Sequence, residues 1–535
     1  MRQKISLQLL PSEAADEAVI KRLIAKTIGK NTDAVSGFLI HKKSIDARSK
    51  TIWVNCTVTA FINEPFQQRP LLSFNFKDVS TAKKKVLIIG AGPAGLFAAL
   101  RLVELGIKPI IWERGKEVRL RRRDLAVLNK QGIVNPDSNY CFGEGGAGTY
   151  SDGKLYTRSN KRGDIDRILN MFVHFGAEEK ILYEAHPHIG TNKLPDIITA
   201  MRLQLINSGA EFLFNKKLSN FTDDGEKITH VSTSDGDIFE PDQVILATGH
   251  SARDIFELLH SKKILIEAKP FALGVRIEHP QSLIDSVQYH SPERSEFLPA
   301  ASYSVVQQVN GRGIFSFCMC PGGIIAPAAT SPGELVVNGW SPSKRNNPYA
   351  NSGIVVQVEI EDALKEFQNS KFNIQHSKFN IQNSTQLSLM WFQKMVEEKC
   401  FDAGGGNFIA PAQRMVDFSN GKLSPTLPAC SYQPGLCAVQ LNEVLPDFIY
   451  QSLALAFVEF GKKIKGFFTN DAIVVTTESR TSSPVRIPRN NDTLAHPQLK
   501  NLYPCGEGAG YAGGIVSAAM DGERVAKKIV ETFKG

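Results

Sequence analysis

The sequence has no apolar run close to the roughly 20 residues that a membrane-spanning helix needs. A signal-peptide core is missing too, because the N-terminus (MRQKISLQLLPSEAADEA) turns acidic before a long apolar stretch develops. The eight cysteines include no CxxC and are too sparse for a secreted disulfide scaffold. These absences predict a cytoplasmic protein with reduced cysteines and no membrane contact.

A strong excess of one charge is also absent, since 62 basic and 54 acidic residues leave a net charge of +8 over 535 residues. This mild bias favours anionic partners, and small anionic ligands would satisfy it as well as nucleic acid would. The densest basic runs are 83–85 and 119–123, which favour solvated faces and linkers over a phosphate- or partner-binding edge. Basic stripes interleaved with aromatic residues are lacking, so nucleic acid is not the expected partner.

The length predicts two or three domains. Residues 1–80 favour a small α/β domain of ferredoxin-like type, with alternating strands at 5–10 and 51–61 and an amphipathic helix after Ser12. Residues 81–269 begin with a strand, a glycine turn, a helix and a strand, whereas 270–464 are mixed and strand-rich, as in an inserted α+β substrate or cap domain. Residues 465–535 return to the first domain, with a helix at 514–533. The duplicated SKFNIQ within 366–386 is interpreted as a tolerated surface insertion.

The strongest motif is the glycine turn in Val86–Phe97, VLIIGAGPAGLF. Gly90 allows the tight turn off the strand, Gly92 lets the backbone approach a pyrophosphate, and Gly95 lets the helix pack near the sheet. Pro93 and Ala94 begin the helix, whose N-terminus offers N–H groups to phosphates. Glu113 closes the next strand 21 positions after Gly92 and can accept hydrogen bonds from ribose hydroxyls. The motif therefore predicts a dinucleotide site.

Three further segments resemble the glutathione-reductase-like FAD superfamily. They are Glu113-Arg114-Gly115, the strand-to-loop segment ending in Thr248-Gly249, and NLYPCGEGAG at 501–510, which contains Gly506 and Glu507. The resemblance implies FAD as the cofactor, with Glu113 and Arg114 at the adenosine and Glu507 at the ribityl chain. Independently, the helix that begins at Gly513, Gly514 and Ile515 directs N–H groups at whatever lies above it. Such a helix start would stabilise a reduced flavin.

Longer motifs narrow the resemblance. FGEGGAGTYSDGKL at 142–155, PHIGT at 187–191, FCMCPGG at 317–323 and TSSPVR at 481–486 resemble a bacterial family of uncharacterised FAD-dependent proteins. Its members are often labelled FAD- or NAD-utilising dehydrogenases and carry an extra N-terminal α/β domain. The resemblance implies an α/β fold with a discontinuous Rossmann-like FAD-binding domain.

Several residues are candidates for direct contact with the flavin or the substrate. Gly145, Gly146 and Ser151 lie in a glycine-rich loop that suggests backbone close to a planar ligand, or else a strained turn without one. Cys318 and Cys320 are either buried thiols or a thiol site near the flavin, and the residues around them do not support a metal site. His188 and His250 are candidate acids or bases, although a single histidine is more often structural.

The sequence therefore predicts an FAD-dependent oxidoreductase that transfers hydride between a small-molecule substrate and flavin N5. A dedicated NAD(P)H domain is not evident, so a nicotinamide would bind transiently or the substrate would reduce the flavin directly. Two alternatives stay open. One is a flavoprotein that acts on RNA, and the other is a non-catalytic FAD-binding module whose residues 1–80 dock a protein partner.

Overall fold

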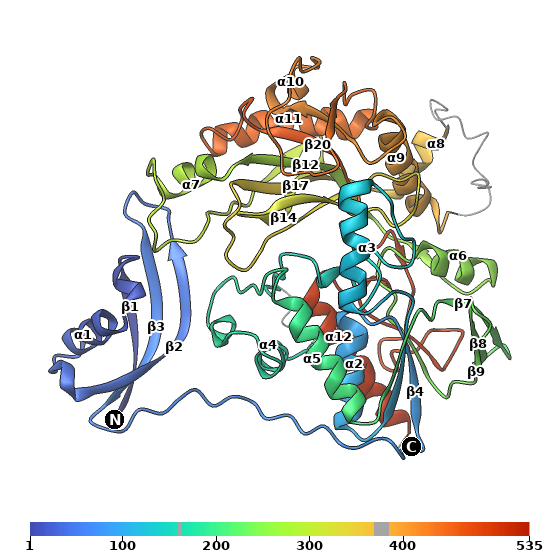
Figure 1. The fold of residues 1–535 in the computed structure, drawn as a ribbon, viewed down its shortest axis with the longest axis horizontal. Coiled ribbons are helices and arrows are strands. Elements are labelled where there is room, and N and C mark those ends of the chain that lie inside the picture. The colour runs from blue at the N-terminus through green and yellow to red at the C-terminus, as the bar shows by residue number, and fades with distance from the viewer. Residues whose placement is uncertain (158–162, 369–384, 534–535) are drawn as a thin grey trace.

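The computed structural model describes residues 1–157, 163–368 and 385–533, which build three units (Figure 1). A small N-terminal domain lies at the left, a Rossmann-like domain at the lower right, and a second domain across the top. The duplicated SKFNIQ segment falls outside the described residues. None of the helices in the described ranges is long and apolar enough to cross a membrane.

The small domain is a three-stranded antiparallel sheet in the order β1-β3-β2 with one long helix packed on it. Its elements are β1 (Arg2–Leu9), α1 (Glu17–Thr27), β2 (Val35–Asp46) and β3 (Trp53–Ile62). Asp16, rather than Ser12, caps α1 by accepting hydrogen bonds from Ala18 N and Val19 N. The expected ferredoxin-like fold is incomplete: residues 63–84, all of them described, contribute no second helix or fourth strand. This segment contains Pro65 and Pro70, which cannot donate to a ladder.

The Rossmann-like domain has a five-stranded parallel sheet in the order β22-β10-β4-β5-β6. Its strands are β4 (Lys85–Ile89), β5 (Lys108–Glu113), β6 (Glu211–Phe214), β10 (Val244–Leu246) and β22 (Leu502–Pro504). One face carries α2 (Pro93–Glu104), α5 (Leu194–Asn207) and α12 (Ile515–Thr532), which lie side by side in Figure 1. A small sheet of β7 (Leu218–Asp223), β8 (Ile228–Thr233) and β9 (Ile238–Phe239) completes the domain with α3 (Val118–Gln131), α4 (Ile165–His174) and α6 (Arg253–Ser261).

The second domain is built on a seven-stranded sheet in the order β13-β14-β17-β12-β20-β18-β19. The strands are β12 (Phe271–Pro280), β13 (Val306–Val309), β14 (Arg312–Cys320), β17 (Tyr349–Val358), β18 (Ala410–Arg414), β19 (Leu436–Ala438) and β20 (Ile473–Glu478). The helices are α7 (Gln281–Tyr289), α8 (Ile360–Gln368), α9 (Ser388–Ala403), α10 (Met415–Ser419) and α11 (Asp447–Lys463), and α11 crosses the sheet. A separate hairpin, β15 (Ile324–Pro327) with β16 (Val337–Trp340), faces the Rossmann-like domain, while β11 (Glu267–Ala268) pairs with β21 (Val485–Arg486). Because β20 belongs to the large sheet, the second domain extends past the expected boundary at 464.

The small domain docks on the Rossmann-like domain through backbone hydrogen bonds at Lys43. Lys43 N donates to Tyr183 O at 2.8 Å, and Ala185 N donates to Lys43 O at 3.0 Å. Arg69 of the connecting segment lies over the ring of Tyr183, 5.7 Å from its centroid. A further hydrogen bond of 3.0 Å joins His290 of the second domain to the Ala47 carbonyl. The N-terminal unit therefore touches both larger domains.

Candidate functional site

Three distant segments meet at the carboxyl ends of neighbouring parallel strands. β10 lies between β4 and β22, so the loops after Ile89, Leu246 and Pro504 leave the same edge of the sheet. In open α/β sheets this edge is where ligands bind. The glycine turn, the Thr248-Gly249 loop and the 505–514 loop are thereby brought together, as the sequence motifs require.

The glycines of these loops fall into two groups. Some are needed for packing: a methyl group added at Gly90 would lie 2.9 Å from the Ala247 carbonyl carbon, and one at Gly95 would lie 3.1 Å from that of Gly90. Others face open space: at Gly249, Gly513 and Gly514 an added methyl group would meet no protein atom within 4 Å. The second group leaves room beside the backbone for a ligand.

The glycine-rich loop at 143–148 packs directly on the first glycine turn. Gly145 N donates to Ala91 O at 2.9 Å, and a methyl group added at Gly146 would lie 3.0 Å from the Gly92 Cα atom. A methyl group at Gly148 would lie 3.2 Å from the side chain of Ile515, at the start of α12. Four segments therefore line one region: the loops at 90–95, 143–148 and 247–251, and the 505–515 segment.

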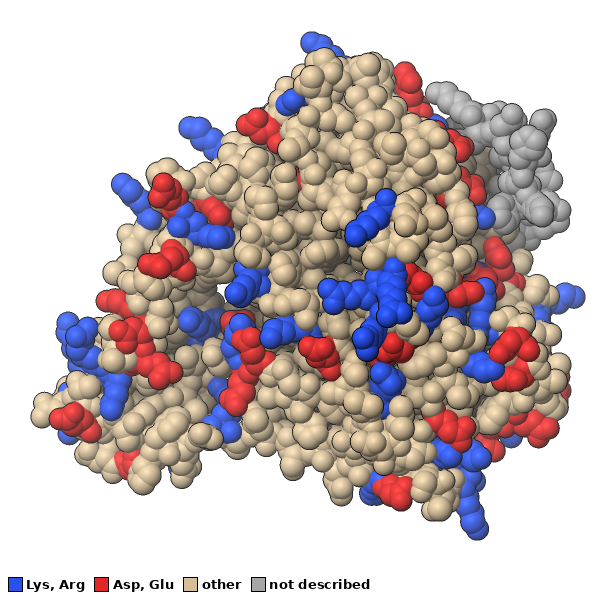
Figure 2. Space-filling model, in the orientation of Figure 1, with Lys and Arg blue, Asp and Glu red and all other residues tan. Residues whose placement is uncertain are grey.

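Arg121 holds this loop in place, a role that the sequence analysis missed. It was included in the basic run at 119–123, but its side chain is fully buried, whereas Arg119, Arg122 and Arg123 are exposed. Figure 2 shows positive side chains gathered over α3. The Arg121 guanidinium donates to the Asn139, Tyr140, Glu144 and Gly146 carbonyls and to Thr149 Oγ1. Its burial could have been predicted from helical spacing, because Arg121 lies on the same face of α3 as the buried residues Val118, Leu125 and Leu128.

Glu113 lies at the centre of the site but is already hydrogen-bonded. Its Oε1 atom accepts from Gly115 N and Gly143 N, and its Oε2 atom accepts from Ala91 N, all at 2.9 Å. A carboxylate offers about four lone-pair positions, so about one remains for a ribose hydroxyl. Glu113 therefore ties the two glycine loops together, in addition to the predicted role of accepting from the ribose hydroxyls.

Two other residues predicted to contact the cofactor are bound to protein groups. Arg114 forms an ion pair with Asp254 and places its guanidinium 4.4 Å from the ring centroid of Phe142. Ser151 Oγ donates to Gly148 O at 2.8 Å and so shapes its own loop. Both lie in the correct loops, but their polar groups are directed at the protein.

Glu507 lies in the loop between β22 and α12. Burial raises the pKa of this carboxyl to about 7, and Lys269 opposes that rise. Beside it, Gly506 N donates to Asp521 Oδ2 at 2.8 Å, and Asp521 pairs with Arg489. The loop is anchored to α12, while no hydrogen bond within the described structure occupies the Glu507 carboxyl.

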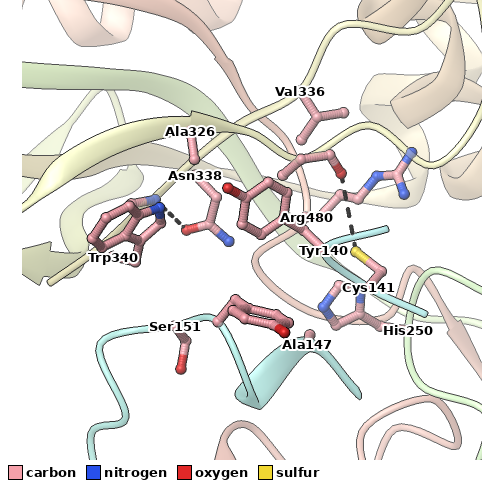
Figure 3. A pocket seen from close by; sticks show the side chains of 13 residues that line it. Tyr140, Cys141, Ala147, Ser151, His250, Ala326, Val336, Asn338, Trp340 and Arg480 are labelled. Atoms are coloured by element: carbon pink, nitrogen blue, oxygen red, sulfur yellow. Dashed lines mark hydrogen bonds between the residues drawn. The ribbon is translucent and has the colours of Figure 1, made fainter. Parts of the chain in front are cut away.

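A narrow cavity of about 40 Å³ opens between the Rossmann-like domain and the β15–β16 hairpin (Figure 3). Its walls come from the 140–151 loop, from His250, from the hairpin and from Arg480; the lining side chains include Tyr140, Cys141, Ala147, Tyr150, Ser151, Val336, Asn338 and Trp340. Figure 3 shows Cys141 and His250 side by side at one end. Of the four predicted catalytic residues, His250 is the one that lines this cavity.

Cys318 and Cys320 form a separate cluster behind the cavity wall. Arg276 pairs with Glu478, donates to Cys318 O at 2.8 Å, and lies 3.5 Å from Cys320 Sγ. Cys320 is buried and Cys318 is exposed, but the surrounding protein desolvates Cys318 and raises the pKa of its thiol to about 11. Such a thiol is a weak nucleophile at neutral pH.

His188 belongs to a different group of charges. Its Nε2 atom lies 3.2 Å from Ser343 O, and its neighbours Asp152 and Arg345 form an ion pair of 2.7 Å. Burial, with a contribution from Arg345, lowers the pKa of His188 to about 4, so the ring is neutral. The structure does not place His188 among the residues that line the cavity.

Arg480 lines the cavity, and its guanidinium makes four hydrogen bonds from its five N–H donors. Its Nη1 atom donates to Thr330 Oγ1 at 2.6 Å, its Nη2 atom to Glu334 and Glu397, and its Nε atom to Glu397. Arg253 binds the same two glutamates at 2.9 and 2.8 Å. Two cations and two anions thus form one buried network between α6, α9 and the strand end after β20.

Comparison with known proteins identifies the cofactor. A family model described as an FAD binding domain matches residues 83–238, and one described as an FAD-dependent protein, C-terminal domain-like, matches 270–481. A domain of unknown function matches residues 1–61. The chain is therefore an FAD-dependent protein, as the motifs predicted, and its second domain ends near 481 rather than at 464.

One relative covers almost the whole chain. An uncharacterised protein of Clostridium beijerinckii (strain ATCC 51743 / NCIMB 8052) is 39% identical over 539 residues, which are 97% of each chain. The chain belongs to the family of that clostridial protein. Placement within the glutathione-reductase-like superfamily stays a prediction, since the matching model describes an FAD binding domain in general.

Among solved structures, similarity is weak and extends over much of the fold. The 2,6-dihydroxypyridine-3-hydroxylase of Arthrobacter nicotinovorans is 10% identical, with a TM-score of 0.35 over 84% of each chain. A glycine oxidase of Bacillus cereus ATCC 14579 is 14% identical, with a TM-score of 0.30 over 84% of this chain and 96% of its own. Neither likeness bears on the reaction.

The residues present fit FAD. Open space at Gly249, Gly513 and Gly514 adjoins the α2 start at Gly92, where N–H groups can receive a pyrophosphate. Glu507 stands in the same loop cluster, and no hydrogen bond in the described structure occupies its carboxyl. These are the features that a long, partly anionic cofactor with a hydroxylated chain requires.

Proposed function

We propose that this protein is an oxidoreductase that moves a hydride between an uncharged small molecule and FAD. The observation that carries the proposal is the convergence of three loops at one edge of the sheet, with the glycine-rich 143–148 loop packed on them, next to a cavity between two domains. When bound, the flavin supplies a two-electron acceptor or donor.

In this proposal different residues bind different parts of FAD. The α2 start at Gly92 and Pro93 binds the pyrophosphate, and Glu113 offers its remaining lone pair to the adenosine ribose, as in the glutathione-reductase-like superfamily. Glu507 binds the ribityl hydroxyls. The N–H groups at Gly514 and Ile515 stabilise negative charge at the ring when it is reduced.

The β15–β16 hairpin supplies the other half of the site. With Tyr140, Tyr150 and Trp340 on its walls, the cavity of about 40 Å³ limits access of water to the reacting atoms and admits only a small reacting group. A nicotinamide would enter transiently, because the motif at Gly90–Gly95 is used by FAD.

Reconstitution followed by anaerobic reduction tests this function. The full chain should take up FAD and show a flavin absorption band, and NADH, NADPH or a member of a metabolite panel should bleach that band. A protein that binds FAD but is bleached by none of these would instead be a non-catalytic FAD-binding module.

A further inference from the structure

Cys141 and His250, which line one end of the cavity, are joined by Ser251 behind them. Ser251 Oγ donates to Cys141 Sγ at 3.3 Å and lies 3.0 Å from His250 Nδ1. A serine hydroxyl has one proton. The thiol of Cys141 itself faces the Ala328 carbonyl at 4.0 Å, so the sulfur can accept the serine proton, and the serine oxygen can then accept from Nδ1–H. This arrangement matches the Nδ1–H tautomer of His250, which leaves the lone pair on Nε2.

The free nitrogen of His250 is accessible from the cavity. The ring lines the cavity wall, and no protein group in the described chain hydrogen-bonds its Nε2 atom. Burial, aided by Arg480 and Arg253 and opposed by Glu397, lowers the pKa of His250 to about 4. At neutral pH the imidazole is therefore an uncharged acceptor.

The electrostatics of the cavity select against ionised ligands. Among the described residues that line it, Arg480 alone is charged, and four of its five N–H donors are directed at Thr330, Glu334 and Glu397. The positive charges of Arg480 and Arg253 are balanced by Glu334 and Glu397. A buried carboxylate ligand would face a charge-balanced network among the described residues, in which Arg480 has one N–H donor left, and it would lose most of its hydration without compensation.

We propose that His250 Nε2 accepts the hydroxyl proton of an uncharged alcohol bound in this cavity, with Ser251 and Cys141 as positioning residues. The assignment rests on the proposed function. In the reaction the O–H proton passes to Nε2 and the C–H hydrogen leaves with its electron pair to the flavin. The carbon and oxygen form a carbonyl, so atoms and electrons balance.

Histidine ¹⁵N NMR on the FAD-loaded full chain tests the assignment without turnover. The signal lost in His250→Asn should show Nδ1–H with an unprotonated Nε2. His230→Asn, at an exposed histidine paired with Glu240, serves as the assignment control. Methanol, which is small enough for a cavity of about 40 Å³, should shift the His250 Nε2 resonance, whereas formate should leave it in place. Ser251→Ala should mix the tautomers while the flavin stays bound.

Each opposite result overturns the proposal. These are a proton on Nε2, a shift with formate as large as that with methanol, and an unchanged tautomer in Ser251→Ala. Failure of the proposed function would appear elsewhere, as a flavin band that no reductant bleaches. The two outcomes are measured on different atoms and are therefore distinguishable.

Discussion

Gly508 lies directly against the backbone of Gly249, so that a methyl group added at Gly508 would stand 2.7 Å from the Gly249 carbonyl carbon. The two residues are far apart in sequence and belong to separate motifs. Their contact joins the loop that follows β10 to the loop that follows β22. Each loop therefore depends on the other for its conformation.

Two glycine substitutions should separate loop packing from cofactor contact. Gly508→Ala should lower the melting temperature of the FAD-free protein, because the added methyl group meets backbone. Gly513→Ala should leave that temperature unchanged or raise it, because a tolerated glycine-to-alanine change typically increases the free energy of unfolding by ~0.4–1 kcal/mol. It should nevertheless weaken FAD binding in a fluorescence titration, because its methyl group projects into the proposed cofactor space. Unaltered FAD affinity in Gly513→Ala would place the cofactor elsewhere.

The buried network around Arg480 should be sensitive to the loss of one charge. Glu397→Gln leaves the two guanidinium groups with one shared carboxylate, that of Glu334, and breaking a buried pair costs about 3–5 kcal/mol. Glu459→Gln, in an exposed pair with Lys462, should cost less than about 1 kcal/mol. Denaturant unfolding of both variants measures the difference, and equal midpoints would contradict the structural role of Glu397.

Glu507 should make the stability of the FAD-free protein depend on pH. Its carboxyl has a folded pKa of about 7 against an ordinary value of 4.5, so the folded protein holds this proton more tightly than the unfolded chain. The contribution is complete below about pH 4.5 and is lost as pH rises to about 7. Glu507→Gln should therefore match the wild type in mild acid and exceed its melting temperature above neutrality. Parallel melting curves across this range would contradict the raised pKa.

Cys318 should react slowly with iodoacetamide in spite of its exposure. Its pKa of about 11, against an ordinary value of 9.0, makes its thiolate fraction roughly a hundredfold smaller than that of an ordinary thiol. Lys154 lowers this pKa, so Lys154→Met should slow alkylation further. Peptide mass spectrometry measures both rates. Fast modification in the wild type would show that the thiol is better solvated than the structure indicates.

The nucleotide-binding elements were predictable because their signals are local. Val86–Ile89, the glycine turn and Glu113 occur within 28 residues, and each follows from turn, strand or helix chemistry. The same local pattern identified the C-terminal helix at 514–533, which the structure shows as α12.

Long-range relationships were not predictable in this way. Cys141 and Ser251 are 110 residues apart, and neither local sequence contains a pattern that predicts their contact. Arg121 looked like part of a solvated basic run because a charged residue is rarely buried without partners, and its partners are carbonyls of a loop 18 to 25 residues away. The apolar sequence of β20 would suit a buried strand in either the five-stranded or the seven-stranded sheet. The domain boundary could therefore not be located from that sequence.

The order of the elements along the chain has a consequence for cofactor binding. β4 and β10 are neighbours in the parallel sheet, but β10 also pairs with β22, and α2, the helix that follows β4, packs against α12. The sheet and the apolar face of α2 are therefore incomplete until β22 and α12 are in place. Since the 505–515 segment between these two elements lines the cofactor region, FAD binding depends on the same closure.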